Sequence, residues 1–212
     1  MITDNKAYMI GKIVKKPVFS HKVYSEGFYL FYIEIPRKSD NVDTLPVVVS
    51  ERLISINRLD VDKTVVINGQ IRSYNQHIDD KHSHLILSVF AREIDILDDV
   101  VINSNENNVV EIEGHICKMP SHRWTPNKRE ITDVMIAVNR TYDKSDYIPT
   151  IVWGRGARFA GRLEVGDSVF VKGRFQSRNY NKHYEDGTVE QKVAYELSAY
   201  EIDYLEEKNE DN

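Results

Sequence analysis

The chain has 212 residues, of which 41% are hydrophobic and 29% charged, a profile that excludes fibrous and disordered proteins and leaves room for one or two domains. Its single cysteine, Cys117, excludes an internal disulfide and cannot hold zinc by itself. No apolar run is long enough to cross a bilayer, and the N-terminal MITDNKAYMIGK lacks a signal-peptide pattern, so we expect a cytoplasmic protein without a membrane partner.

The net charge of −5 is unevenly distributed along the chain. Residues 120–182 carry twelve Lys or Arg against six Asp or Glu, whereas residues 183–212 carry two against ten. A basic block therefore lies beside an acidic one that hides it from the average. This pattern indicates an anionic partner for one part of the chain.

The sequence contains two copies of one pattern. GKIVKKP at 11–17 recurs as GHICKMP at 114–120, an offset of 103 residues, and VVING at 65–69 recurs as VFVKG at 169–173. Chance agreement of this kind along a whole domain is improbable, so we predict a tandem duplication. The predicted parts are a first copy at 1–98, a linker at 99–107, a second copy at 108–205 and an acidic tail at 206–212.

Each copy is predicted to be mostly strand. Apolar residues alternate at 31–35 and again at 134–138, and short β-branched runs follow at 47–49, 65–67 and 169–171. The segments 51–59 and 154–163 are long enough for one or two helical turns. Five strands with a short helix after strand 3 are typical of the OB-fold. We therefore predict an all-β protein of two tandem OB-fold barrels, each five-stranded with a short helix after strand 3.

Four aromatic residues occur in the second copy alone. They are Trp124, Tyr142, Tyr147 and Trp153, and the matching residues of the first copy are His21, Ser39, Thr44 and Ser50. Aromatic residues favour strands and often fill barrel interiors. A core aromatic exchanged for serine or threonine, however, leaves a cavity or an unpaired hydroxyl. We therefore predict that these four side chains lie on the surface.

Basic residues are interleaved with these aromatics. They are Arg123, Lys128, Arg129, Arg140, Lys144, Arg155, Lys172, Arg174 and Arg178. Single-stranded nucleic acid needs both kinds of residue, because cations contact its phosphates and flat rings stack on its bases, at about 1–3 kcal/mol per base. The combination favours a surface for single-stranded nucleic acid.

Residues 122–180, HRWTPNKREITDVMIAVNRTYDKSDYIPTIVWG and onward to SRNY, resemble bacterial single-stranded DNA-binding proteins. The matching motifs are the RWTPN turn, the AVNRT strand end, the IVW-then-basic strand and the VFVKGR strand. The resemblance is strong over 108–205 and reaches 5–97 through the repeat alone. It implies that bases stack on Tyr142, Tyr147, Trp153 and Tyr180, with Trp124 in the turn, and that Arg140, Arg155 and Arg178 line the path.

The chain departs from that family in two respects. Members usually have one barrel per chain, form tetramers and end in a long tail whose tip recruits replication proteins. Here two barrels per chain imply a homodimer with four barrels. The acidic end EEKNEDN lacks the recruiting tip, which leaves contacts with replication or repair proteins open. The first copy keeps Arg37, Arg72 and, near the position of Tyr180, Tyr74; it either binds DNA through these residues or serves mainly in assembly.

Enzymatic functions are poorly supported by the sequence. His82 and His84 could form a metal pair, but no third ligand stands out, and a solvated hairpin explains them better. Gly154, Gly156 and Gly161 are too sparse for a phosphate loop. We expect no catalysis, no cofactor and no metal.

The predicted function is therefore sequence-independent binding of single-stranded DNA in replication, recombination or repair, in a protein of bacterial, plasmid or phage origin. RNA stays open as a ligand, because stacking on aromatics works for either sugar. The alternative is an OB-fold adaptor, for example a primosome or mobile-element accessory factor, with weak or secondary nucleic-acid binding.

Overall fold

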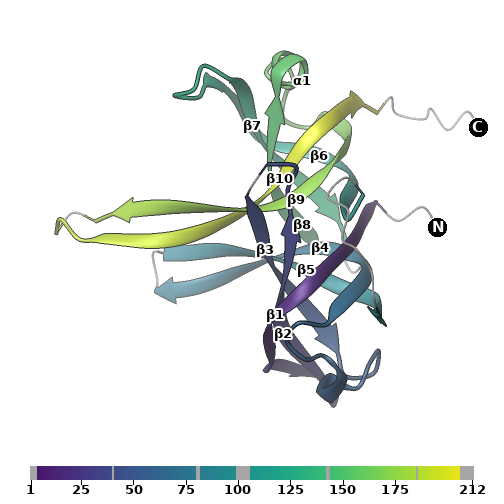
Figure 1. Ribbon diagram of the computed structural model, residues 1–212. Coiled ribbons are helices and arrows are strands. Elements are labelled where there is room, and N and C mark those ends of the chain that lie inside the picture. Colours follow the sequence, from purple (N-terminus) through teal and green to yellow (C-terminus); the bar gives the residue numbers. More distant parts are fainter. Residues whose placement is uncertain are drawn as a thin grey trace, which may run out of the picture.

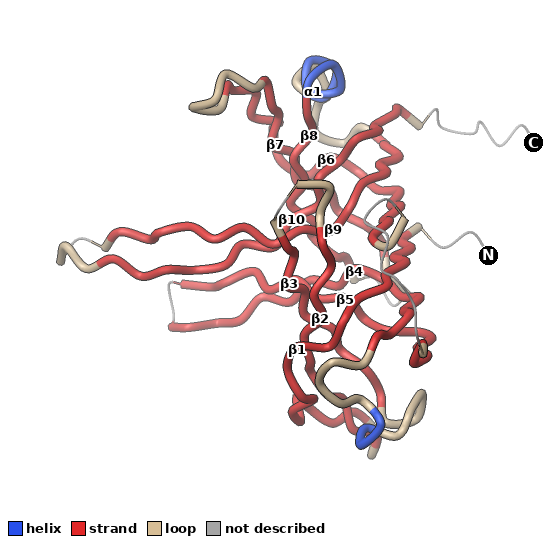
Figure 2. Tube along the Cα trace, viewed as in Figure 1, coloured by secondary structure: helices blue, strands red, loops and turns tan. Residues whose placement is uncertain are grey.

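The computed structural model describes residues 4–39, 41–79, 82–98, 106–141, 144–184 and 186–205; of residues 76–79, 82 and 83 it describes the backbone alone. Ten strands form one continuous sheet (Figures 1 and 2). The first half contains β1 (Asn5–Val23), β2 (Glu26–Pro36), β3 (Val42–Ser50), β4 (Thr64–Asp79) and β5 (His82–Leu97). The second half contains β6 (Asn108–Trp124), β7 (Glu130–Asn139), β8 (Ser145–Trp153), β9 (Ser168–His183) and β10 (Val189–Tyr204).

Each half closes into a five-stranded barrel. The first has the order β2-β3-β5-β4-β1 and closes through β1 and β2, and the second has the order β7-β8-β10-β9-β6 and closes through β6 and β7. The contacts β3–β5 and β8–β10 are parallel and the others are antiparallel. This confirms the predicted all-β architecture of two OB-fold barrels.

The two segments after the third strands differ. After β8 the chain forms α1 (Gly154–Ala160), whereas after β3 it makes a single 3-10 turn at Ile56–Arg58. The prediction of a short helix thus holds as an α-helix in the second copy alone. GRGARFA contains two glycines, which are weaker helix formers than any residue of ERLISINRL, so intrinsic helix propensity does not explain this difference.

Strand alternation places the core inside each barrel. Phe31, Ile33 and Ile35 are at most 1% exposed, and Phe175 is fully buried. These residues belong to one apolar cluster that continues through both halves. Among the described residues, no helix is long and apolar enough to span a membrane.

The barrels are joined through equivalent strands. β1 pairs with β6 in antiparallel register, so that Asn5 lies opposite Ile112 and Met9 opposite Asn108. Asn5 and Asn108 make matching contacts: the side chain of each donates from Nδ2 to a backbone oxygen at 2.7 Å, and its Oδ1 accepts from the N–H of that same residue, at 2.9 Å, on Ile71 or Phe175. The two halves are therefore related by an approximate twofold axis.

The strand pairs β4–β5 and β9–β10 extend beyond their barrels as two long hairpins, which project to the same side of the molecule (Figure 1). Their bases cross the junction between the barrels, since β4 contacts β8 and β9 contacts β3. The hairpins thus bring residues of one barrel to the outer face of the other.

Candidate nucleic-acid interface

The outer face of β8 carries two of the predicted aromatics. Ile148 and Val152 point into the core and are at most 1% exposed, so the alternation turns Tyr147 and Trp153 outward, where they are 43% and 36% exposed. Trp153 donates from Nε1 to Ser198 Oγ on β10 at 3.0 Å. The prediction that these side chains lie on the surface is confirmed.

Trp124, at the end of β6, is also on the surface and is 61% exposed. The turn after it is closed by Thr125, whose N–H donates to Arg129 O at 2.8 Å and whose Oγ1 accepts from the Arg129 N–H at 3.0 Å. Lys128 in this turn has a positive φ of 56° and is exposed. The turn thus has an exposed indole at its start and an exposed lysine within it.

The other predicted stacking residues lie on the two long hairpins or outside the described residues. Tyr74 on β4 is 65% exposed. Tyr180 on β9 is half-buried, with the Arg178 guanidinium carbon 5.9 Å from its ring centre. Tyr142 lies outside the described residues.

Tyr147 contacts the hairpin of the other barrel. Its N–H donates to Ser73 Oγ on β4 at 2.8 Å. The contact joins β4 of the first barrel to β8 of the second, and the next residue of β4, the exposed Tyr74, points to the opposite face of the strand from Ser73. Comparison of the two copies position by position missed this, because it treats each barrel separately.

Asp146 is the centre of the polar contacts at this junction. It is fully buried, and its carboxylate accepts from Arg140 Nε at 2.5 Å, from Arg140 Nη2, from Arg72 Nη1 at 3.1 Å and from the Ser73 N–H at 2.5 Å. Arg140 also donates to Ser73 O at 3.0 Å. One carboxylate therefore fixes two guanidiniums and the backbone of the opposite barrel.

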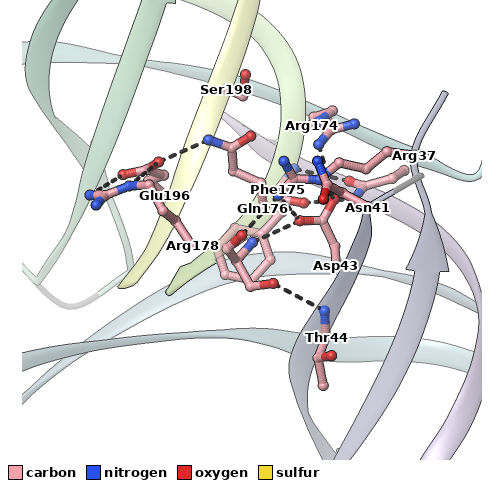
Figure 3. A network of polar contacts seen from close by, with 12 residues as sticks. Arg37, Asn41, Asp43, Thr44, Arg174, Phe175, Gln176, Arg178, Glu196 and Ser198 are labelled. Atoms are coloured by element: carbon pink, nitrogen blue, oxygen red, sulfur yellow. Dashed lines mark hydrogen bonds and ion pairs between the residues drawn. The ribbon is translucent and has the colours of Figure 1, made fainter. Parts of the chain in front are cut away.

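Asp43 repeats the arrangement on the other side of the twofold axis (Figure 3). It accepts from Arg37 Nε at 3.0 Å, from Arg37 Nη2 at 2.5 Å, from Arg174 Nη2 at 3.1 Å and from the Ser177 N–H at 2.9 Å. The Thr44 N–H donates to Ser177 Oγ at 3.1 Å, as Tyr147 does to Ser73.

Four of the residues predicted to bind phosphate instead bind a buried carboxylate at the junction of the barrels. They are Arg37, Arg72, Arg140 and Arg174. Burial lowers the pKa of the Arg72 and Arg174 guanidiniums from the ordinary value, and the adjacent carboxylates oppose this shift. The sequence contained a signal for this structural role. When the two copies are aligned at an offset of 103, the aromatic residues differ, whereas Arg37 aligns with Arg140 and Asp43 with Asp146.

Three further predicted cations form ion pairs of their own. Arg123 Nε lies 2.5 Å from Asp133, Lys172 Nζ lies 2.7 Å from Glu111, and Arg178 Nε lies 3.3 Å from the buried carboxylate of Glu196, which Gln176 also contacts (Figure 3). Lys128 and Arg155 are exposed, and within the described parts of the chain no carboxylate lies at ion-pair distance from either. Of the histidine pair considered for a metal, His84 is exposed and the side chain of His82 lies outside the described part.

Residues 107–205 match the model of the single-strand binding protein family. The match lies within the second barrel, so this barrel is similar to the family. Single-stranded DNA-binding protein A of Bacillus subtilis is 33% identical over 109 residues, 48% of this chain and 61% of the relative. Single-stranded DNA-binding protein 2 of Listeria innocua is 32% identical over 109 residues, 48% of this chain and 66% of the relative. The chain thus spans less than two thirds of these curated relatives.

The likeness of fold extends over both barrels. The wild-type single-stranded DNA-binding protein from Thermus aquaticus superposes with a TM-score of 0.74, at 17% identity, over 95% of this chain and 93% of that one. A deletion mutant of the same Thermus aquaticus protein gives a TM-score of 0.70 at 18% identity, over 98% of both chains. At this identity the likeness shows the fold alone.

Proposed function

We propose that this chain, whose second barrel is similar to the single-strand binding protein family, binds single-stranded DNA without sequence preference, and that bases stack on the outer face of β8. The observation that carries the proposal is the exposure of Tyr147 and Trp153. The first barrel has Thr44 and Ser50 at the matching positions and still forms a closed barrel. Since a barrel of this kind forms without these rings, folding does not account for them.

The proposed path includes rings from both barrels. Trp153 and Tyr147 lie on the outer face of β8, and β4 of the first barrel, which carries the exposed Tyr74, contacts Tyr147 through Ser73. Trp124, Tyr180 and Tyr142 extend the proposed stacking set. Each stacked base contributes about 1–3 kcal/mol.

The structure divides the proposed phosphate contacts into two groups. Lys128 and Arg155 are exposed and unpaired among the described residues, and Arg123 and Arg178 are half-exposed in ion pairs that a phosphate can replace. In contrast, Arg37, Arg72, Arg140 and Arg174 bind buried carboxylates, so we assign them to positioning the barrels. Lys172 forms an ion pair with Glu111, so we do not assign it a phosphate contact.

In a cell, such binding protects single strands during replication, recombination or repair, and involves no catalysis. The curated relatives are named for binding single-stranded DNA, which favours this function over an adaptor role. A homodimer of two-barrel chains presents four barrels to one strand, the number that the resemblance to the family implies. Native mass measurements with and without oligo-dT test this assembly.

The decisive experiment uses the two tryptophans, Trp124 and Trp153, which both lie in the second barrel. Titration with oligo-dT at low salt is expected to quench their fluorescence, and the absence of a quench refutes the proposal. Binding of labelled oligo-dT, followed by anisotropy, is expected to weaken by about 5- to 150-fold in Trp153→Ala, the equivalent of one stacked base.

Ser50→Ala changes the matched position of the first barrel and serves as the control. Ser50 is 5% exposed and its hydroxyl contacts Glu26, so its folded fraction is verified before binding is compared. If Ser50→Ala and Trp153→Ala weaken binding equally, β8 is not the stacking face.

A further inference from the structure

The two barrels exchange an aromatic residue and a serine between neighbouring strands. In the second barrel Trp153 ends β8 and faces Ser198 on β10. In the first barrel the residue that matches Trp153 is Ser50 on β3, and the residue that matches Ser198 is Phe90 on β5. The pairing confirms this equivalence, because Phe90 lies beside Val48 as Ser198 lies beside Ile151. Both outer faces thus carry an aromatic residue at this strand pair. It comes from β8 in the second barrel and from β5 in the first.

Phe90 is oriented outward. Its neighbours along β5, Val89 and Ala91, are at most 2% exposed and point into the core, whereas Phe90 is partly exposed. The ring of Phe28 lies 5.7 Å from it, and the ring of His21 stacks on Phe28 at 4.9 Å with an interplanar angle of 7°. We call these three rings the Phe90 cluster.

A second residue of the Phe90 cluster also aligns with a planar residue of the second barrel. His21 is exposed and matches Trp124 in the second barrel. Both outer faces therefore carry a planar side chain near the end of the first strand and another at the junction of the third and fifth strands. The matched faces differ in which residues supply the rings, and agree in where the rings lie.

Cations adjoin the cluster. The guanidinium carbon of Arg92 lies 5.2 Å from the centre of the Phe90 ring, and that of Arg72 lies 6.0 Å from it. Arg92 is exposed and donates from Nη2 to the neutral side chain of Gln70 at 3.2 Å. The carboxylate of Glu26 beside Ser50 has its own counter-charge, since it lies 3.2 Å from Arg52.

We propose that the Phe90 cluster is a second base-stacking surface, and that one single strand of DNA contacts both barrels. Phe90 and His21 are the rings of the cluster that reach the surface, since Phe28 is 8% exposed. Rings with guanidiniums over or beside them are the chemistry that accepts an unstacked base with its flanking phosphates. The inference rests on the proposed function, because its ligand is the same strand. Arg72 supports continuity between the two surfaces, since it contacts both the Phe90 ring and Asp146 of the second barrel.

The two surfaces are separable by fluorescence, because both tryptophans belong to the second barrel. Phe90→Leu keeps the apolar bulk and removes the flat ring. With a long oligo-dT, we expect Phe90→Leu to keep the tryptophan quench but to bind about 5- to 150-fold more weakly and to cover fewer nucleotides per chain. Phe90→Tyr keeps the ring and is expected to bind like the unchanged protein. Equal affinity and equal covered length for Phe90→Leu and Phe90→Tyr overturn the inference.

A direct reporter places tryptophan at the cluster itself. In a chain that carries Trp124→Phe, Trp153→Phe and Phe90→Trp, the fluorescence comes from the first barrel alone. Quenching by oligo-dT supports the second surface. If the unchanged protein is quenched and this variant binds oligo-dT without a quench, the second surface is refuted and the proposed function stands. If the unchanged protein is not quenched, the proposed function itself fails.

Discussion

Replacement of Asp146 by asparagine tests whether the buried carboxylates hold the two barrels together. Asp146 accepts four hydrogen bonds, from Arg140 twice, from Arg72 and from the backbone of Ser73. An asparagine oxygen can still accept from Ser73. Its NH2 group, however, faces guanidinium donors, and two cations that are 21% and 24% exposed lose their counter-charge.

The cost follows from the burial of the pair. Removal of one partner of a buried ion pair typically costs about 3–5 kcal/mol, because the other charge stays buried and uncompensated. Arg72 and Arg140 retain some solvent, so the lower end, about 3 kcal/mol, is expected for Asp146→Asn. For a chain of this size each 1 kcal/mol shifts the Tm by roughly 2–4 °C. The expected decrease is therefore about 6–12 °C.

Thermal unfolding followed by circular dichroism measures the effect, and two variants calibrate it. Asp43→Asn removes the equivalent carboxylate and is expected to lower the Tm by a similar amount. Asp133→Asn breaks the pair with Arg123, whose side chains are 38% and 49% exposed, so its expected cost is at most about 1 kcal/mol. If Asp146→Asn unfolds no earlier than Asp133→Asn, the carboxylate does not stabilise the junction.

Two further predictions concern salt and pH. Removal of both unpaired cations by Lys128→Ala and Arg155→Ala is expected to reduce the slope of log K against log salt for oligo-dT by about 1.4, two phosphates at about 0.7 each; an unchanged slope assigns the phosphates to other residues. Burial, with a contribution from Tyr32, raises the pKa of Tyr195 from 10.0 to about 12, so the folded state holds this proton more tightly than the unfolded state and stability is lost between pH 10 and 12. Tyr195→Phe is expected to lessen that loss in alkaline unfolding, and parallel losses in both proteins contradict it.

The strands and their orientation could be predicted from the sequence because they depend on local alternation. Phe31, Ile33 and Ile35 are buried in the first barrel, and Tyr147 and Trp153 are exposed in the second, as a period of two residues requires. The missing α-helix after β3 shows the limit of length as a criterion. A segment long enough for two turns forms only one 3-10 turn, because length permits a helix without requiring one.

The contacts of the arginines could not be predicted from local patterns. Asp146 binds Arg72 and Ser73 across 74 and 73 residues of sequence, and no periodicity within a strand reports such a pairing. From the sequence, the charge of Arg72 and Arg140 led to the prediction of phosphate contacts. The structure shows that they contact a carboxylate instead. The Phe90 cluster was not predicted for a related reason. Phe90 on β5 takes the role of Trp153 on β8, and an alignment at one offset pairs Trp153 with Ser50, so it shows only the loss of a ring.

The fused duplication explains why the junction and the outer faces differ in this way. In a dimer of identical chains, every substitution appears in both barrels, whereas here each barrel can change alone. At the junction a single change leaves buried guanidiniums or backbone groups of the opposite barrel without a partner, so Asp43 and Asp146 keep equivalent contacts. On the outer face a ring needs only room beside a small residue, which either strand can supply. The two halves therefore retain one interface and present two different faces.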